Sequence, residues 1–185
     1  MSLKVFAFAG SLRKGSYNKL ALRNAVELKP ADMIIEIFDL APIPLYNEDL
    51  REKGFPPVVQ ELREKIRRAD ALLIVTPEYN YSMPGVLKNA IDWASRPPDQ
   101  PFNDKPVAIM GASGSILGSA RAQYDLRRSC VFLNMHVINK PEVMIAQAHT
   151  KFDSAGRLTD ETARKLIAEL LLNLAAWARR LGASA

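Results

Sequence analysis

The sequence contains few of the residues that many catalytic and metal-binding sites use. It has one cysteine, Cys130, and two histidines, His136 and His149. A single cysteine excludes an internal disulfide and fits a reducing cytosol, so we expect a buried structural thiol. Neither histidine has a partner at metal-ligand spacing, and H-E-x-x-H is absent. We therefore expect no metal site, and a surface or packing role for both histidines.

Long hydrophobic runs are also missing. No apolar run approaches the roughly 20 residues of a membrane-spanning helix, so we expect no membrane insertion. The start, Met1-Ser2-Leu3-Lys4, runs directly into the first expected strand, which predicts no signal peptide and a cytoplasmic protein. With 185 residues, 48% of them hydrophobic, the chain is long enough for one domain, 1–185, with a full core.

A concentrated charge of one sign is absent. The net charge is +5 and the pI is about 9.4, yet the basic residues at 63, 65, 67 and 68 are interleaved with glutamates at 61 and 64. Nucleic-acid binders more often carry a one-sided basic stripe with aromatics, so we expect no nucleic acid. The positive excess favours anionic ligands by electrostatic steering and leans towards NADPH over NADH.

Strand and helix patterns alternate along the chain. Apolar runs predict strands at 5–9, 33–38, 71–75, 107–110 and 135–138. Helical spacing predicts helices at 17–28, 58–68, 84–95, from the 111–118 loop to about 132, and from Thr159 to Gly182. Residues 39–57 read as a long irregular stretch, and 141–148 is undecided between loop and an extended continuation. This alternation predicts an α/β fold with a five-stranded parallel sheet of order 2-1-3-4-5 and helices on both faces.

The first loop, Gly10–Asn18, joins a strand to a helix, where α/β proteins bind phosphate. Ser11, Ser16 and Asn18 supply side-chain donors, and Arg13 supplies a fork that suits a phosphate. The loop matches neither G-x-x-x-x-G-K-[ST] nor G-x-G-x-x-G, which favours a terminal monoester phosphate over a pyrophosphate. The alternative is an ordinary polar turn.

Two further loops leave neighbouring strands at the same edge of the sheet. Thr76–Gly85 holds two tyrosines, an asparagine and two prolines, and Gly111–Gly118 is rich in glycine and serine. Rigid aromatic faces with hydrogen-bonding tips suit the edge and face of a planar heterocycle. The alternative is a structural turn whose tyrosines pack on a neighbour.

Three segments together carry a family likeness. Gly10–Asn18, with Pro77-Glu78-Tyr79-Asn80-Tyr81-Ser82 and Leu87-Lys88-Asn89-Ala90-Ile91-Asp92-Trp93, resembles the NADPH-dependent FMN reductase family, nearest its soluble quinone and chromate reductases. The likeness covers essentially the whole chain. This sequence departs slightly from the family pattern, because the family often has phenylalanine at the position of Tyr17 and a small residue at the position of Val86. It implies a flavodoxin-like three-layer sandwich, bound FMN, and homodimers that pair into tetramers.

The resemblance also implies the site residues. The FMN phosphate would be held by Ser11, Arg13, Ser16 and Asn18, with Tyr17 in the same loop. The isoalloxazine ring would be bordered by Pro77, Glu78, Tyr79 and Asn80, with Tyr81 close by and Ser113 and Gly114 on the other side. We expect no catalytic side chain, because the flavin carries the chemistry. Arg121, Tyr124 and Glu142 would join Tyr81 in a network at subunit contacts, or else are unrelated surface residues.

The activity that the resemblance implies is ping-pong transfer of two electrons. Hydride would pass from NADPH or NADH to FMN, and then electrons would pass to quinones, free flavin, azo dyes or chromate. Three alternatives stay open. They are a flavodoxin-type electron carrier, which is usually acidic, an FMN reductase that supplies reduced flavin to a monooxygenase, and a regulator without flavin.

Overall fold

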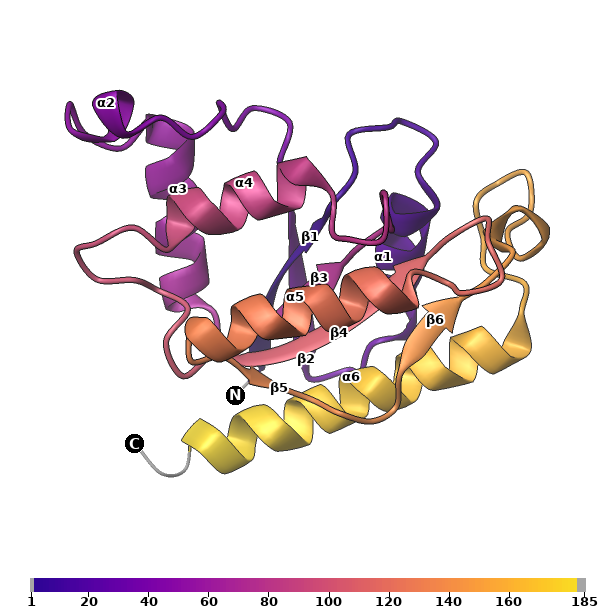
Figure 1. Cartoon of the computed structure of the whole chain (residues 1–185). Helices are drawn as coiled ribbons and strands as arrows, with labels where there is room; N and C mark the ends of the chain where they lie inside the picture. The colour runs from indigo at the N-terminus through magenta and orange to yellow at the C-terminus, as the bar shows by residue number, and fades with distance from the viewer. Residues whose placement is uncertain (1, 183–185) are drawn as a thin grey trace.

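A parallel β-sheet forms the central layer of the chain in a computed structural model that describes residues 2–182 (Figure 1). Its strands are β1 (Leu3–Ala9), β2 (Met33–Phe38), β3 (Ala71–Val75), β4 (Pro106–Ala112), β5 (His136–Val137) and β6 (Val143–Ile145). Their order is β2-β1-β3-β4-β5, and every pairing is parallel. The predicted order 2-1-3-4-5 is confirmed.

The fifth position of the sheet is shared by two short strands. β5 pairs with the start of β4, at Pro106 and Val107, and β6 pairs with its end, from Met110 to Ala112. The expected single strand 135–138 is therefore shorter, and the undecided stretch 141–148 provides the extended continuation. Pro141 lies between the two strands, where a residue without an N–H interrupts a ladder.

Helices cover both faces of the sheet. They are α1 (Tyr17–Leu28), α2 (Glu48–Arg51), α3 (Pro57–Arg68), α4 (Gly85–Ala94), α5 (Ala120–Phe132), the 3₁₀ turn η1 (Ala148–Thr150) and α6 (Glu161–Gly182). The helices α1 and α6 pack on one face, and α3, α4 and α5 pack on the other (Figure 1). Within residues 2–182 no helix combines the length and apolar character that crossing a bilayer requires.

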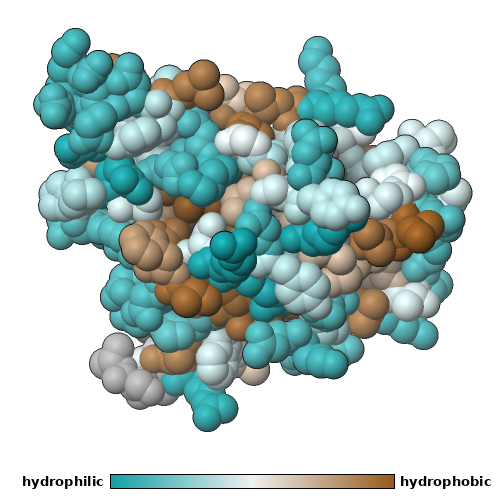
Figure 2. Space-filling view, viewed as in Figure 1, coloured by the Kyte–Doolittle hydropathy of each residue, from teal (hydrophilic) through white to brown (hydrophobic). Residues whose placement is uncertain are grey.

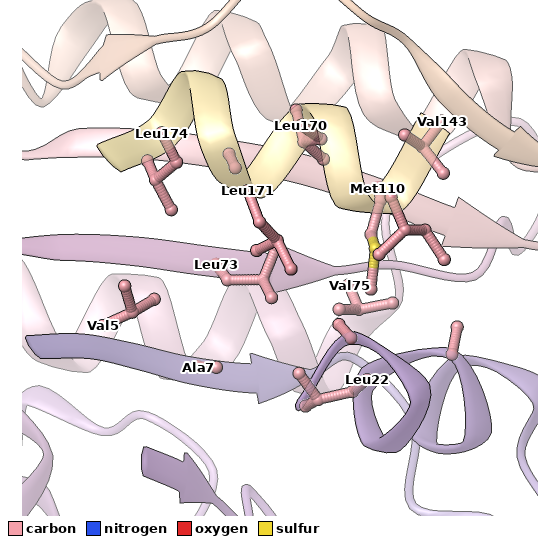
Figure 3. Close-up of a cluster of buried hydrophobic side chains, with 14 of the residues drawn as sticks. Val5, Ala7, Leu22, Leu73, Val75, Met110, Val143, Leu170, Leu171 and Leu174 are labelled. Atoms are coloured by element: carbon pink, nitrogen blue, oxygen red, sulfur yellow. The ribbon is translucent and has the colours of Figure 1, made fainter. Parts of the chain in front are cut away.

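The core is built around the central strand β3, which is apolar at every position. Successive side chains of β3 point to opposite faces, and all five of its residues are buried. On one face, Leu73 and Val75 pack with Leu22 of α1 and with Leu170 and Leu171 of α6 (Figure 3). Burying each such leucine contributes about 2 kcal/mol. This packing fixes α1, the helix that follows the first loop, and α6, which packs on the same face of the sheet.

Two local details differ from the expectation. The stretch 39–57 is not irregular throughout, because it contains the one-turn helix α2, capped by the Asn47 side chain. The last helix begins at Glu161 and not at Thr159, because Asp160 caps it. The Asp160 carboxylate accepts the Ala163 N–H at 2.8 Å, which satisfies a free donor of the first turn.

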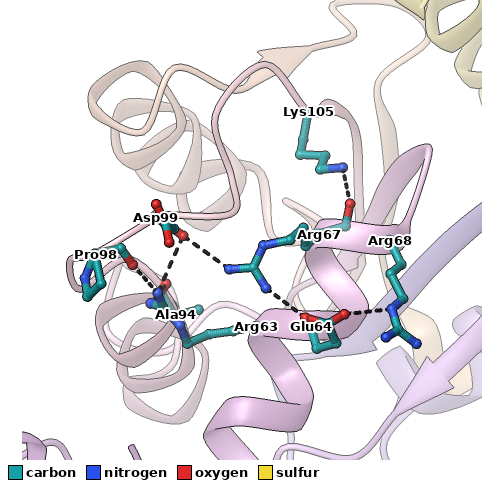
Figure 4. A network of polar contacts seen from close by, with 8 residues as sticks. All are labelled: Arg63, Glu64, Arg67, Arg68, Ala94, Pro98, Asp99 and Lys105. Carbon is teal, nitrogen blue, oxygen red and sulfur yellow. Dashed lines mark hydrogen bonds and ion pairs between the residues drawn. The ribbon is translucent and has the colours of Figure 1, made fainter.

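A buried arginine ties α3 to the segment after α4. Arg63 is 6% exposed and donates to the carbonyls of Ala94 and Arg96, each at 2.6 Å, and to those of Pro98 and Asp99 (Figure 4). Burial lowers the pKa of Arg63 from its ordinary value. A charged donor thereby satisfies the carbonyl of the last residue of α4 and three carbonyls of the segment that follows it.

The expectation for Cys130 is confirmed. This residue lies on α5 with its thiol buried in the core, and burial raises its pKa to about 12. Such a thiol is almost never ionised near neutral pH, so it is a packing residue.

Candidate functional site

Three loops meet at the carboxyl ends of β1, β3 and β4, which are neighbours in the sheet. They are residues 10–16, 76–84 and 113–119, and Figure 1 shows all three at the same end of the sheet. Open α/β sheets bind ligands at this edge.

The first loop presents an unusual number of free donors. The backbone N–H groups of residues 11–15 form no hydrogen bond with any part of the chain from 2 to 182. Ser11 is only 3% exposed, and neither its hydroxyl nor the exposed Arg13 guanidinium has a partner in that range. Unpaired N–H groups and a guanidinium together are what a phosphate monoester requires.

Ser16 and Asn18 have structural duties in the same loop. The Ser16 hydroxyl caps α1 by accepting the N–H groups of Asn18 at 3.2 Å and Lys19 at 3.4 Å. The Asn18 amide donates to the Ala112 carbonyl at 2.8 Å and accepts the Ala112 N–H at 2.9 Å. Asn18 therefore fixes the first loop to the end of β4, and the second N–H of its amide is the group that it can still offer to a ligand.

The second loop closes on itself in a tight turn. Tyr79 and Ser82 exchange two backbone hydrogen bonds of 3.0 Å around Asn80 and Tyr81, whose φ angles are 49° and 70°. Positive φ at both central residues defines a type I′ turn, which asparagine tolerates and tyrosine disfavours by about 1–3 kcal/mol. The turn holds the Tyr81 side chain 72% exposed, with the Arg121 guanidinium 3.6 Å from its ring centroid.

Glu78 joins this loop to α5. Its carboxylate accepts the N–H groups of Arg121 at 3.0 Å and Ala122 at 3.4 Å, and the Arg121 Nε at 2.5 Å. Ser119, at the start of α5, provides no side-chain cap, so Glu78 supplies it across the sheet edge. The hydrogen bond to Glu78 raises the pKa of Arg121. With its carboxylate engaged in this way, Glu78 has chiefly its backbone to offer a ligand.

The end of β4, immediately before the third loop, lies against the start of the second loop. A Cβ added at Gly111 would lie 2.2 Å from the Thr76 carbonyl oxygen, so no larger residue fits there. The Ser113 N–H donates to Ile145 at 3.0 Å, while Gly114 is exposed with open space around it. The structure therefore brings Ser113 and Gly114 to the same edge as the first two loops.

Sequence reasoning missed two supports of this site. Tyr17 stacks on Phe152, with ring centroids 5.8 Å apart and planes at 22°. The Gln123 amide, 2% exposed, donates to Val143 at 3.0 Å and so ties α5 to β6. Both contacts join residues far apart in the sequence, and no local pattern signals them.

The proposed subunit-contact residues form two separate pairs within the chain. Tyr124 donates to Glu142 at 2.9 Å, whereas Arg121 binds Glu78 and covers Tyr81. The part of the chain that the structure describes holds no cluster of metal-binding side chains. A hollow of about 650 Å³ does exist at the opposite end of the sheet, beside Lys105 and Asp104, but the free donors of the first loop are far from it.

The fold and these loops define a flavodoxin-like α/β protein in which a loop of unpaired donors lies at the same sheet edge as an exposed tyrosine turn. The chain belongs to the NADPH-dependent FMN reductase family, whose model matches residues 3–150.

Individual relatives agree with this assignment. The chain is 60% identical over 179 residues to an NAD(P)H-dependent FMN reductase of Pseudomonas aeruginosa, covering 97% of each chain. It is 49% identical over 162 residues to a quinone reductase of Escherichia coli K12, covering 86% of each. Among solved structures, the flavoenzyme NAD(P)H:(acceptor) oxidoreductase FerB of Paracoccus denitrificans superposes with a TM-score of 0.87 at 33% identity, covering 96% of this chain and 98% of FerB.

Proposed function

We propose that this chain is an FMN-dependent NAD(P)H oxidoreductase that reduces quinones. The observation that carries the proposal is the first loop, where five consecutive backbone N–H groups, the Ser11 hydroxyl and the Arg13 guanidinium lack partners within residues 2–182. These groups fit the phosphate of FMN, and the family supplies the expectation of this cofactor.

Different residues would bind the phosphate of FMN, stabilise the loop that binds it, and border the ring. Ser11, Arg13 and the N–H groups of 11–15 would bind the phosphate, while Ser16 and Asn18 hold the loop in shape and Tyr17 supports it from α1. The ring would be bordered by Pro77, Glu78, Tyr79, Asn80 and Tyr81, with Ser113 and Gly114 opposite. These loops are cross-linked by Asn18 and Glu78, so they are preorganised for a rigid ring.

Bound FMN would supply the redox chemistry, accepting hydride from NAD(P)H and passing two electrons to an acceptor in ping-pong order. The protein contributes position and field. Backbone N–H groups of the third loop that have no partner within residues 2–182, such as that of Gly114, can stabilise negative charge on a ring that lies against them. The exposed tyrosine turn leaves room for acceptors of several shapes, so we include free flavin, azo dyes and chromate beside quinones.

The test is a visible spectrum of protein purified with excess FMN, recorded without oxygen before and after NADPH. We expect flavin absorbance that stays with the protein through gel filtration and bleaches on NADPH addition, followed by parallel double-reciprocal lines with a quinone. A colourless protein refutes the proposal. Intersecting lines refute the ping-pong order. Loss of flavin during gel filtration favours an FMN reductase that supplies reduced flavin to another enzyme. Flavin that is reduced only by a protein partner, and not by NADPH, favours an electron carrier.

We also propose that residues 1–185 form one cytoplasmic domain that assembles as homodimers pairing into tetramers. Brown, apolar side chains reach the surface on the face seen in Figure 2. Helix α5 carries three large exposed ones, Tyr124 at 53%, Val131 at 80% and Phe132 at 85%. Such residues on one helix are typical of an interface. Light scattering on the eluting protein measures the mass, and a monomer would contradict the proposal.

A further inference from the structure

A hollow lies between α1 and the edge strand β2, and Ala9, the residue before the first loop, is part of its lining. Its volume is about 270 Å³. Its lining combines apolar residues with two cations and one carboxylate, namely Ala9, Lys19, Leu22, Arg23, Ile37, Phe38 and Asp39. Ile37 is 47% exposed, which is unusual for an isoleucine in a strand next to a helix. An apolar floor with a charged rim is typical of a small-molecule site.

The charges on the rim are unbalanced. Lys19 and Arg23 stand four residues apart on α1, where like charges face each other and destabilise the helix. Arg23 is exposed and has no partner within the described residues 2–182. Lys19 has one ion-pair partner, Asp39 at 3.8 Å, and the same carboxylate also accepts the Ala41 N–H at 3.1 Å. One positive charge is therefore left free for an anion.

The hollow is linked to the proposed FMN site through Ala9 and helix α1. Ala9 ends β1 immediately before the first loop, and Ser16 caps the helix that carries both cations. At a rise of about 1.5 Å per residue, Lys19 lies roughly 5 Å and Arg23 roughly 10 Å along the helix from Ser16. A long ligand whose reactive end reaches the tyrosine turn can thus place its other end here.

We propose that this hollow binds the adenosine end of NADPH, with the 2′-phosphate held by Arg23 and Lys19. This inference rests on the proposed function. Adenine is a flat base whose faces suit the floor of Leu22, Ile37 and Phe38. A phosphate suits the guanidinium of Arg23, which can bind it through two N–H groups. The subsite is specific for the phosphate that distinguishes NADPH from NADH.

The kinetic test compares NADPH with NADH in the FMN-loaded protein. Arg23→Gln is expected to raise KM for NADPH about tenfold, the effect of one charge-assisted hydrogen bond, and to leave kcat and the KM for NADH within about twofold. Arg68→Gln is the matched control, because Arg68 is also an exposed helical arginine but lines the hollows near the opposite end of the sheet. It should change neither KM.

A binding test works without turnover. Calorimetry of the FMN-loaded protein should show adenosine 2′,5′-bisphosphate binding more tightly than adenosine 5′-monophosphate, and Arg23→Gln should remove that difference. Ile37→Glu changes a half-exposed position that tolerates a polar residue, and it should weaken the binding of both ligands. Equal affinities in the parent protein, or an unchanged difference in Arg23→Gln, overturn the subsite even if NADPH is oxidised. A parent protein that oxidises neither nucleotide overturns the proposed function, and the subsite with it.

Discussion

The two hydrogen bonds between Asn18 and Ala112 give the sharpest prediction about the site. They join the first loop to the end of β4 at 2.8 and 2.9 Å, and both residues are at most 3% exposed. Asn18→Ala leaves the Ala112 N–H and carbonyl without this partner in a place that excludes water. It also removes the amide N–H that the loop can offer to a phosphate.

The magnitude follows from these losses. Each of the two buried polar groups left unpaired costs about 1–3 kcal/mol, so the free energy of unfolding should fall by about 2–6 kcal/mol. For a chain of this size, that lowers Tm by about 4–24 °C. Loss of a hydrogen bond to a charged phosphate, worth about 1.5–3 kcal/mol, should weaken FMN binding about 10- to 100-fold.

The assay pairs denaturant unfolding of the flavin-free protein with fluorescence titration of FMN. Asn24→Ala is the matched control, because Asn24 is also a buried asparagine of α1 with its amide engaged at both ends. It donates to Leu20 and Gly156 and accepts the Leu158 N–H, away from the three loops. It should lose similar stability and keep its FMN affinity. The reasoning is refuted if Asn18→Ala binds FMN as tightly as the parent protein, or if both variants lose the same amount of affinity for FMN.

Three further predictions concern stability. Burial raises the pKa of Cys130 from 9.0 to about 12, so above about pH 9 the unfolded chain releases a proton that the native chain keeps. The free energy of unfolding should therefore fall by about 1.4 kcal/mol per pH unit above about pH 9. Denaturant unfolding at pH 8–10 measures this slope, which should be absent in Cys130→Ala. Gly111→Ala should fail to fold or lose Tm by more than 10 °C, roughly 3 kcal/mol, because its Cβ would meet the Thr76 carbonyl, whereas Gly114→Ala should keep the parent Tm. Arg63→Met should lose about 3 kcal/mol by orphaning the carbonyls after α4, and a calorimetric Tm within 2 °C of the parent would contradict this.

Local sequence patterns were sufficient to predict most of the helices and strands. The helix at 17–28 and the strands at 33–38 and 71–75 have the bounds that their apolar spacing predicts. These segments carry an uninterrupted period and clear end signals, so the local preference and the tertiary packing agree. The strand expected at 135–138 is shorter, because its position in the sheet is shared with Val143–Ile145, and pairing across the sheet is decided by the partner strand.

The site could be predicted as a set of loops but not in its internal contacts. The residue types of Gly10–Asn18 indicate a phosphate, yet nothing local indicates that the Asn18 amide turns towards Ala112. Glu78 was expected beside a ring, and nothing local indicates that its carboxylate caps α5. Both contacts span the sheet edge, and only the completed strand order brings their partners together.

These contacts explain why the site can be rigid and still present free donors. Asn18 and Glu78 satisfy backbone groups of β4 and α5, so the three loops are held by their own polar side chains. The groups without a partner within residues 2–182 include the N–H groups of residues 11–15, the Arg13 guanidinium and, on α1, the guanidinium of Arg23. All are donors or cations, and none is a carboxylate. A scaffold that uses its acceptors internally and leaves its donors open is complementary to anions, which fits the phosphate of FMN at the first loop and the 2′-phosphate of NADPH that we propose at Arg23.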